Sequence, residues 1–413
     1  MQFSDSQFPA TQKHSRSDSY CWTGSTCKNI RTFTEMKRFE NYDLSTHNTF
    51  GMKVKAALYI EYESVDELKS LDFASLPQPV FHIGAGSNLL FTGDFPGTVL
   101  HSGIKFIKYV DMGLDEVLLT VGAGVIFDDF VANVAGNGLW GPENLSLIPG
   151  EVGAAAVQNI GAYGVEAKDI IAGVVCLDTK DWSKTAFKVG ELAYGYRDSM
   201  FKHNRGRYIV TSVLFKVTRK YSPKLEYGGI RTALKIPADY SPAADPLGSY
   251  GLTPQAVREA IIGIRNAKLP DPAKIGSAGS FFKNPVVSRE HFERIAAAEA
   301  AARPSATGKG PVCVPQGEPS TGIARPQSPA SAAVPHYDLP DGNVKIPAAW
   351  LIDQCGLRGM TLGGAQVYEK QPLVIVNASG TASPKDVLSL EEKIIADVKE
   401  RFGIELHPEV DHI

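Results

Sequence analysis

The sequence predicts an α+β protein with more than one domain, and three observations lead to this. The chain has 413 residues, more than one hydrophobic core usually serves. Short strand-like apolar runs alternate with segments whose apolar residues recur at helical spacing. Two glycine-rich loops follow such runs, as expected where backbone closes around a ligand.

The first 40 residues are rich in Ser, Thr, Lys and Arg and lack an apolar period, so we expect a disordered extension over 1–40. A first α/β unit is expected over 41–104, with the C-terminal residues 404–413 returning to it. Its predicted elements are strands at 57–62, 80–83 and 98–102 and a short helix at 65–71.

A second α/β unit is expected over 105–240. Phe127, Phe130, Val131 and Val134 recur at helical spacing and predict a helix over 126–137. The strands predicted for this unit are 106–110, 117–121, 170–177, 185–189 and 208–217.

The third region, 241–403, is framed by two helices with clear end signals. Thr253 and Pro254 begin one helix, which Pro270 prevents from continuing. Ser383 begins the last helix, with Asp386 completing a capping box and Gly403 ending it. The alternation of Ile404 and Leu406 predicts a strand after it. Between these helices, the Ala, Pro, Ser and Gly bias of 299–335 predicts a disordered insertion.

Composition excludes several classes of partner. The hydrophobic content of 43%, charged content of 21% and net charge of −3 are those of a soluble globular protein and argue against nucleic acid or an acidic membrane. No apolar run reaches the roughly 18 residues of a membrane span, and the N-terminus has no apolar signal core, so we expect a cytoplasmic protein. Neither the nine histidines nor the five cysteines show metal-ligand spacing, so no metal is predicted. The cysteines are expected to be free thiols: Cys21, Cys27, Cys176, Cys313 and Cys355.

The segment 142–164, PENLSLIPGEVGAAAVQNIGAYG, is the most informative loop. Its glycines and alanines let backbone approach a bulky ligand, and it contains no lysine, so its N–H groups would have to neutralise a phosphate. A second cluster, GAGSNLL, follows the apolar run 79–83. Leu89 occupies the sixth position of the dinucleotide fingerprint, so we reject a Rossmann site there.

Four groups of polar residues could carry chemistry. Arg197 lies between Tyr196 and Asp198 and could stabilise negative charge, although a structural Arg–Asp pair is equally open. Ser280 stands in a glycine turn without a histidine to activate it, so proton donation suits it better than nucleophilic attack. Glu409 follows the expected last strand, and Arg358 and Gln371 could bind an anionic substrate.

Taken together, these motifs resemble the UDP-N-acetylenolpyruvoylglucosamine reductase (MurB) family. The matching segments run in order from about residue 44 to residue 411, and they include HNTFG, GAGSNLL, PENLSLIPGEVGAAAVQNIGAYG, YGYRDSMFKH, RNAKLPDPAKIGSAGSFFKNP, WLIDQCGLRG, GGAQVYEKQPLVIVN and PEV. The resemblance implies a two-part FAD-binding domain of the vanillyl-alcohol-oxidase type, formed by 41–104 and 105–240. A third, substrate-binding domain then corresponds to 241–403.

The resemblance also implies the site residues. Arg197, Ser280 and Glu409 match the catalytic positions. Tyr227 matches the tyrosine that covers the substrate in one subclass. The other residues at substrate positions are Tyr196, Lys268, Asn284, Arg358 and Gln371. The FAD positions are Gly84, Ala85, Gly86, Ser87, Asn88, Leu89, Ile148, Pro149, Gly150, Gly153, Gln158, Asn159, Gly161, Ala162, Tyr163 and Gly164.

The implied reaction is the NADPH-dependent reduction of UDP-N-acetylglucosamine enolpyruvate to UDP-N-acetylmuramate, a step of peptidoglycan precursor synthesis, by a monomer with non-covalent FAD. Arg358 departs from the lysine of many relatives, and Tyr368 from a histidine. A flavin-dependent oxidase of the same fold is the alternative. Covalent flavin attachment in such oxidases needs a His or Cys near the glycine loops, and neither residue occurs in 84–97 or 142–164.

Overall fold

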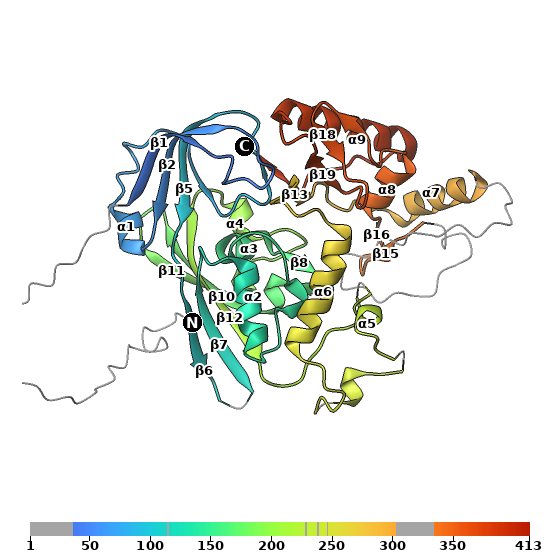
Figure 1. The fold of residues 1–413 in the computed structure, drawn as a ribbon, viewed down its shortest axis with the longest axis horizontal. Helices are drawn as coiled ribbons and strands as arrows, with labels where there is room; N and C mark the ends of the chain where they lie inside the picture. The colour runs from blue at the N-terminus through green and yellow to red at the C-terminus, as the bar shows by residue number, and fades with distance from the viewer. Residues whose placement is uncertain (1–35, 114, 228, 238, 246, 303–333) are drawn as a thin grey trace, which may run out of the picture. The chain divides into compact units, whose positions relative to one another are not determined.

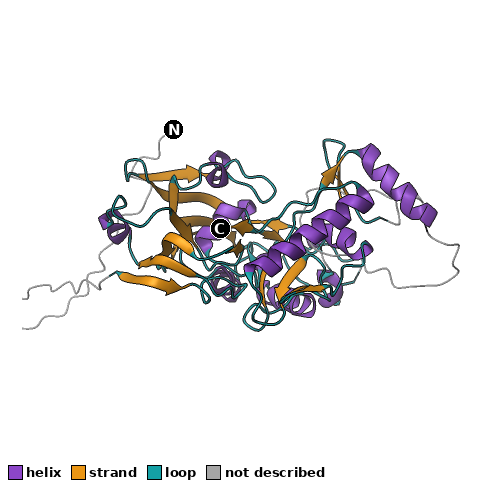
Figure 2. Ribbon diagram, turned by 90° about the horizontal axis from the view of Figure 1, so that it is seen from above, coloured by secondary structure: helices purple, strands orange, loops and turns teal. Residues whose placement is uncertain are grey.

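The computed structural model describes residues 36–113, 115–227, 229–237, 239–245, 247–302 and 334–413. Three main sheets carry this part of the chain (Figure 1). Figure 2 gives the view from above, with helices, strands and loops in separate colours. Among the described residues, no helix is both long and apolar enough to cross a membrane.

The first sheet has the order β1-β2-β5-β3, with β1 antiparallel to β2 and the other pairs parallel. Alternate residues of β2 are buried, as its KAALYIEY pattern requires. The side chain of Ser64 caps the following helix by accepting a hydrogen bond from the amide of Glu67. The elements are β1 (Lys37–Asp43), β2 (Lys55–Tyr62), α1 (Val65–Ser70), β3 (Val80–Ile83), β4 (Leu89–Leu90) and β5 (Phe95–Ser102).

The second sheet is antiparallel, in the order β11-β10-β12-β7-β6. Helices α2, α3 and α6 bury their apolar faces in its core, and Figure 1 shows α2 beside α6. Phe130 of α2 stacks on Phe215 of β12 with ring centroids 4.3 Å apart. The strands of this sheet are β6 (Ile107–Asp111), β7 (Glu116–Gly122), β10 (Ile171–Asp178), β11 (Lys184–Lys188) and β12 (Tyr208–Thr218), and a separate short pair is formed by β8 (Gly161–Ala162) and β9 (Val165–Glu166). The helices are α2 (Phe127–Gly136), α3 (Val152–Gln158), α4 (Met200–His203), α5 (Ile230–Ala233) and α6 (Pro254–Lys268).

The C-terminal part is built on the sheet β13-β19-β18-β17, and α8 and α9 bury their apolar residues in the same core. Helix α9 has the predicted ends, a capping box between Ser383 and Asp386 and a left-handed Gly403. The strands are β13 (Gly276–Ser280), β14 (Val286–Val287), β15 (Tyr337–Asp338), β16 (Val344–Lys345), β17 (Thr361–Leu362), β18 (Ala365–Val367), β19 (Val374–Asn377) and β20 (Asp411–His412). The helices are α7 (Arg289–Ala302), α8 (Ala348–Gln354) and α9 (Pro384–Phe402).

Three details correct the sequence analysis. Residues 37–40, assigned to the disordered extension, lie in β1, which the pattern missed because its side chains are largely exposed and polar. Helix α7 continues to Ala302, past the predicted start of the insertion at 299. The strand expected at Ile404 and Leu406 is absent from this described segment: both side chains are buried, but no strand pairs with them. The rest of the extension, 1–35, and 303–333 lie outside the described residues.

Candidate active site

The two glycine-rich loops meet each other. The hydroxyl of Ser87, in the first loop, donates a hydrogen bond to the carbonyl of Pro149 in the second, at 3.2 Å. Gly150 has φ of 119°, and a Cβ on it would lie 2.9 Å from the Ser87 Oγ. A side chain at this position would therefore be both strained and in collision, which explains the glycine.

The HNTFG motif supports the first loop. A Cβ on Gly86 would lie 2.0 Å from the carbonyl oxygen of His47, and the amide of Thr49 donates to the Gly86 carbonyl at 3.1 Å. The Thr49 hydroxyl donates to the carbonyl of Ser277 in β13 at 2.5 Å. The same short motif thus fixes the first glycine loop and the strand that ends at Ser280.

The first loop has the donors that a phosphate needs. Within the described residues, no protein acceptor is paired with the backbone N–H groups of Ala85, Gly86 or Ser87. Consecutive N–H groups without internal partners form an anion-binding concavity. The residues present therefore fit the pyrophosphate of a dinucleotide such as FAD, held by amides instead of a lysine.

Arg197 is buried beside the second glycine loop. Its backbone is left-handed, with φ of 53°, in a turn closed by the bridge between Gly195 and Asp198. The guanidinium donates from Nε to Glu409 Oε1 at 2.7 Å and from Nη2 to the carbonyl of Gly161 at 3.1 Å. Asp198, the partner in the simpler Arg–Asp alternative, has a carboxylate oxygen 2.8 Å from His203 Nε2.

Glu409 is held by the backbone on both sides. Its amide donates to the carbonyl of Phe281 at 2.8 Å, and its carbonyl accepts from the side chain of Asn88 at 3.0 Å. Strand β20 then pairs in parallel with β4, directly after the first glycine loop. Since Ser280 precedes Phe281, the chain brings all three predicted catalytic residues, Arg197, Ser280 and Glu409, to one region.

Two lysines were missed by sequence reasoning. Lys202 Nζ donates to Gln158 Oε1 at 2.9 Å and to the carbonyl of Arg197 at 3.3 Å, and its burial lowers the pKa of the ammonium. Buried Lys345 places Nζ 4.1 Å from the centre of the Tyr196 ring. Lys202 belongs to the YRDSMFK motif and could have been found there, whereas only the fold brings Lys345 to Tyr196.

Two predicted FAD positions, Asn159 and Gly164, contact neighbouring segments of the chain. Asn159 is fully buried, and its side chain donates to the carbonyl of Gly195 at 2.8 Å and accepts from the amide of Lys168 at 3.0 Å. This amide therefore fastens the loop to the Arg197 turn. Gly164 has φ of 79° and lies against Tyr227, whose Cβ would be 3.4 Å from an added Cβ.

The predicted substrate residues divide into two groups. Tyr196 and Tyr227 adjoin the site: the Arg197 guanidinium lies 5.4 Å from the Tyr196 ring centre, and the Tyr227 hydroxyl lies 3.3 Å from that of Tyr337. The other four residues lie in the third region, 241–403. Asn284 accepts from the amide of Ala348 at 2.8 Å, Arg358 pairs with Asp353 at 2.6 Å, Lys268 ends α6 and Gln371 lies in the turn between β18 and β19.

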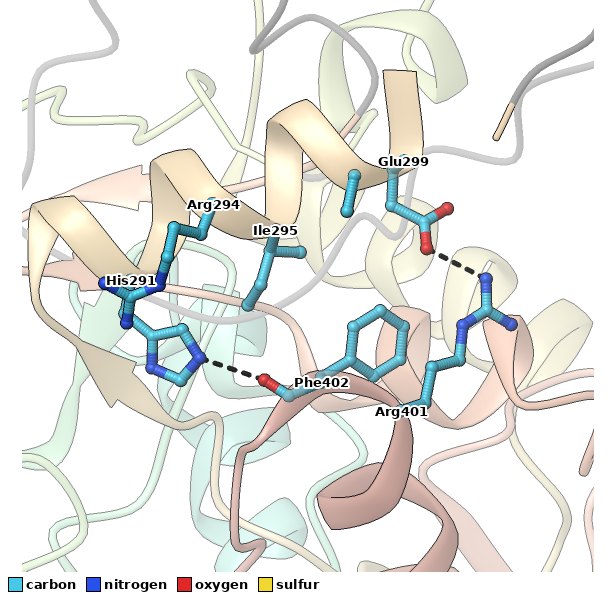
Figure 3. A pocket seen from close by; sticks show the side chains of 7 residues that line it. His291, Arg294, Ile295, Glu299, Arg401 and Phe402 are labelled. Carbon is cyan, nitrogen blue, oxygen red and sulfur yellow. Dashed lines mark hydrogen bonds and ion pairs between the residues drawn. The ribbon is translucent and has the colours of Figure 1, made fainter. Parts of the chain in front are cut away.

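A pocket of about 200 Å³ lies elsewhere, between α7 and the end of α9 (Figure 3). Its polar side chains are engaged with each other and with backbone: Arg401 pairs with Glu299 at 2.8 Å, and a ring nitrogen of His291 lies 2.9 Å from the carbonyl of Phe402. None of the predicted site residues lines it.

Comparison with known proteins identifies the family of the chain. Residues 56–181 match the family model described as an FAD binding domain, and residues 271–413 match that of the UDP-N-acetylenolpyruvoylglucosamine reductase C-terminal domain. The UDP-N-acetylenolpyruvoylglucosamine reductase of Bacteroides fragilis (strain YCH46) is 44% identical over 377 residues, 91% of this chain and 99% of that protein. The Neisseria gonorrhoeae enzyme of the same name is 41% identical, covering 89% of this chain and 95% of that protein.

A crystal structure of the Thermus caldophilus enzyme matches with a TM-score of 0.57 at 24% identity, covering 91% of this chain and 98% of the other, and shows the likeness of fold. The fold and the loops thus define an FAD-dependent oxidoreductase, with the predicted α+β arrangement of a two-part FAD-binding domain and a third domain. More narrowly, the chain belongs to the UDP-N-acetylenolpyruvoylglucosamine reductase family. Its subclass, its domain boundaries and its individual site residues stay predictions.

Proposed function

We propose that this protein reduces UDP-N-acetylglucosamine enolpyruvate to UDP-N-acetylmuramate in peptidoglycan precursor synthesis, with NADPH as the electron donor. The single observation that carries the proposal is the buried Arg197–Glu409 pair between the two glycine loops, in a chain of this family. The net reaction adds a hydride and a proton to a carbon–carbon double bond and oxidises NADPH to NADP⁺. FAD, when bound, supplies the hydride chemistry.

Arg197 is assigned to charge stabilisation. Hydride addition to the β-carbon of the enolpyruvyl group places negative charge on the adjacent carbon and its carboxylate. A guanidinium that is already fixed by Glu409 and by the Gly161 carbonyl needs little reorganisation to face that charge. Glu409 is the polar partner that keeps Arg197 in place.

Ser280 is assigned to proton donation. It ends β13, next to the Phe281 carbonyl that binds the Glu409 amide, and a Cβ added to Gly279 before it would meet no atom within 4 Å. A hydroxyl at this point can deliver the proton that completes the reduction, since it is a donor that needs no prior ionisation.

The sugar nucleotide is assigned to the residues around Tyr227. Tyr227 and Tyr337 bring two hydroxyls together beside Gly164, and Lys268, Asn284, Arg358 and Gln371 supply the charge and hydrogen bonds for a diphosphate. Buried Lys345 on Tyr196 adds a cation close to Arg197. We propose that the enzyme works as a cytoplasmic monomer.

The test is the Ser280→Ala variant in two separate half-reactions under anaerobic conditions. We expect NADPH to bleach the bound flavin at the wild-type rate, because Ser280 acts only on the second substrate. Reoxidation by UDP-N-acetylglucosamine enolpyruvate should fall by hundreds-fold or more, since one preorganised donor is worth about 3 to 4 kcal/mol. Equal loss of both half-reactions would contradict the role given to Ser280.

The wild-type protein separates this proposal from the flavin oxidase. Reduced wild-type protein should regain its yellow colour when the enolpyruvyl sugar nucleotide is added without oxygen. Reoxidation by oxygen alone, with no response to the sugar nucleotide, would overturn the proposed function in favour of the oxidase.

A further inference from the structure

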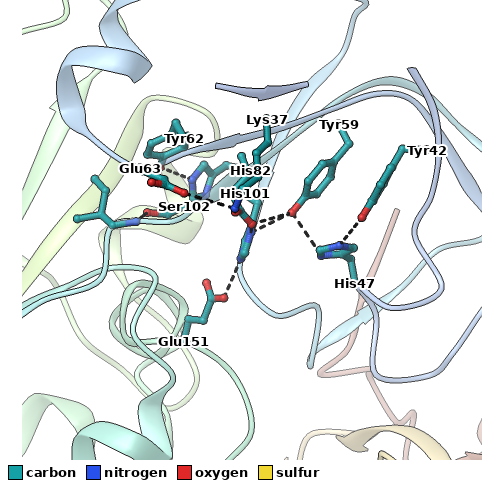
Figure 4. A network of polar contacts seen from close by, with 12 residues as sticks. Lys37, Tyr42, His47, Tyr59, Tyr62, Glu63, His82, His101, Ser102 and Glu151 are labelled. Atoms are coloured by element: carbon teal, nitrogen blue, oxygen red, sulfur yellow. Dashed lines mark hydrogen bonds and ion pairs between the residues drawn. The ribbon is translucent and has the colours of Figure 1, made fainter. Parts of the chain in front are cut away.

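A buried histidine, His101, lies within hydrogen-bonding distance of two carboxylates, and Figure 4 shows it beside Glu151. His101 is in β5, and its Nδ1 lies 2.9 Å from Glu61 Oε2 of β2. Its Nε2 lies 2.8 Å from Glu151 Oε1, in the second glycine loop just before α3. His101 and Glu151 are 7% and 4% exposed, so this contact is shielded from water.

The geometry favours the charged form of His101. A neutral imidazole has one N–H donor, whereas the imidazolium has two. Because both ring nitrogens face carboxylate oxygens at hydrogen-bonding distance, the arrangement is satisfied by the imidazolium form. The hydroxyl of Tyr59, 3.0 Å from Nδ1, completes the contacts of this ring.

The neighbouring titratable groups support this assignment. Lys37 from β1 pairs with Glu61 at 2.5 Å. Burial alone would raise the pKa of Glu61, but its contacts with Lys37 and His101 lower it to about 2. The other two histidines of Figure 4, His47 and His82, have lowered pKa values because they are buried near His101. Burial also opposes charge on His101, but Glu151 and Glu61 outweigh it and raise its pKa above 6.5.

The position of the pair connects it to both loops. His101 is aligned with Ile83 in the β3–β5 pairing, and Ile83 is the residue before Gly84 of the first loop. A Cβ on Gly84 would lie 3.0 Å from the Cβ of Ala154 and 3.4 Å from Glu151 Oε2. Glu151 thus lies against the first loop while it belongs to the second, and its carboxylate is bonded to the first sheet through His101.

We propose that protonated His101 is a positioning residue that clasps the second glycine loop to the first sheet through Glu151, so that FAD is retained only while the clasp is charged. The proposal rests on the assignment of the two loops to FAD. It adds a pH-dependent control of cofactor retention that the reduction itself does not require.

The direction of the pH dependence follows from the raised pKa of His101. The stabilisation is complete below the ordinary histidine value of 6.5, and it is lost as pH rises through the higher folded-state pKa. Neutral His101 can donate to only one of its two carboxylates, so the bond to Glu151 weakens. FAD should therefore leave faster at higher pH.

The experiment measures release of FAD from the flavin-loaded protein after dilution, by the fluorescence of free FAD, between pH 6 and 9. We expect the rate of FAD release from the wild-type protein to rise with pH. The total rise should be on the order of tenfold for each pKa unit by which the clasp raises the pKa of His101. His101→Gln should release FAD quickly at every pH, without the wild-type slope. Glu151→Gln should move the acceleration to lower pH, and it carries the test alone if His101→Gln does not fold.

The matched control is His82→Gln, which removes a buried histidine from the adjacent strand β3. The FAD release rate of this variant should rise with pH as in the wild-type protein, because His82 is neutral. Wild-type release that does not change with pH, or a slope that survives in His101→Gln, would overturn the clasp. A protein that shows the clasp but does not reduce the sugar nucleotide would overturn only the proposed function.

Discussion

Two arginine–carboxylate pairs of similar length lie in very different surroundings. Arg197 and Glu409 are 2.7 Å apart with side chains 9% and 10% exposed. Arg358 and Asp353 are 2.6 Å apart with side chains 38% and 33% exposed. Charges act far more strongly on one another away from water. We therefore expect the buried pair to stabilise charge on a substrate and the exposed pair to contribute only weak attraction.

Arg197→Gln should give the largest effect. The substitution removes the fixed guanidinium charge and leaves the carboxylate of Glu409 without its cationic partner. Substrate-dependent flavin reoxidation should therefore slow by hundreds-fold or more. Single-turnover absorbance at the flavin band measures this rate. Arg207→Gln is the control, since Arg207 also pairs with a carboxylate, Asp178, but is 45% exposed. A decrease below tenfold in Arg197→Gln would mean that burial does not distinguish the two kinds of pair.

Glu409→Gln should have an intermediate effect. Glutamine can still accept from Arg197, so the geometry survives, but the charge that holds the guanidinium is lost. Hydrogen bonds to charged groups contribute roughly 1.5 to 3 kcal/mol, which predicts a kcat lower by about 10- to 100-fold. Glu405→Gln, on the same segment but paired with Lys399 in solvent, should keep the wild-type kcat. An equal loss in both variants would point to a disturbed C-terminal segment instead.

The elements with strong local signals were predictable from the sequence. The ends of α9 follow from Ser383, Asp386 and Gly403 because capping depends on residues within one turn. Strand β1 was missed because its exposed edge carries no apolar alternation. The alternation of Ile404 and Leu406 correctly predicted that both side chains are buried. Whether such a segment forms a strand depends on a neighbouring strand, which the local sequence pattern does not contain.

The site also combines features that local sequence predicts with contacts that arise only on folding. Arg197, Ser280 and Glu409 could be named because each lies in a recognisable motif of this family. Their contacts could not, since the Glu409 amide meets Phe281 and its carboxylate meets Arg197 only after the chain has folded. The His101–Glu151 contact joins residues 50 positions apart, and of the two only Glu151 lies in one of these motifs.

Arg358→Gln should give the smallest effect and complete the comparison. Exposed ion pairs are worth about 0 to 1 kcal/mol, so the expected change is a rise in KM for the sugar nucleotide of roughly fivefold or less, with kcat unchanged. The rise should shrink as salt is added, because screening weakens attraction between exposed charges. Steady-state kinetics at low and high ionic strength measure it, with Arg294→Gln as a control for a more exposed, ion-paired arginine on α7. A large fall in kcat would show that Arg358 leaves Asp353 and reaches the reacting group, and the division between buried and exposed pairs would then be wrong.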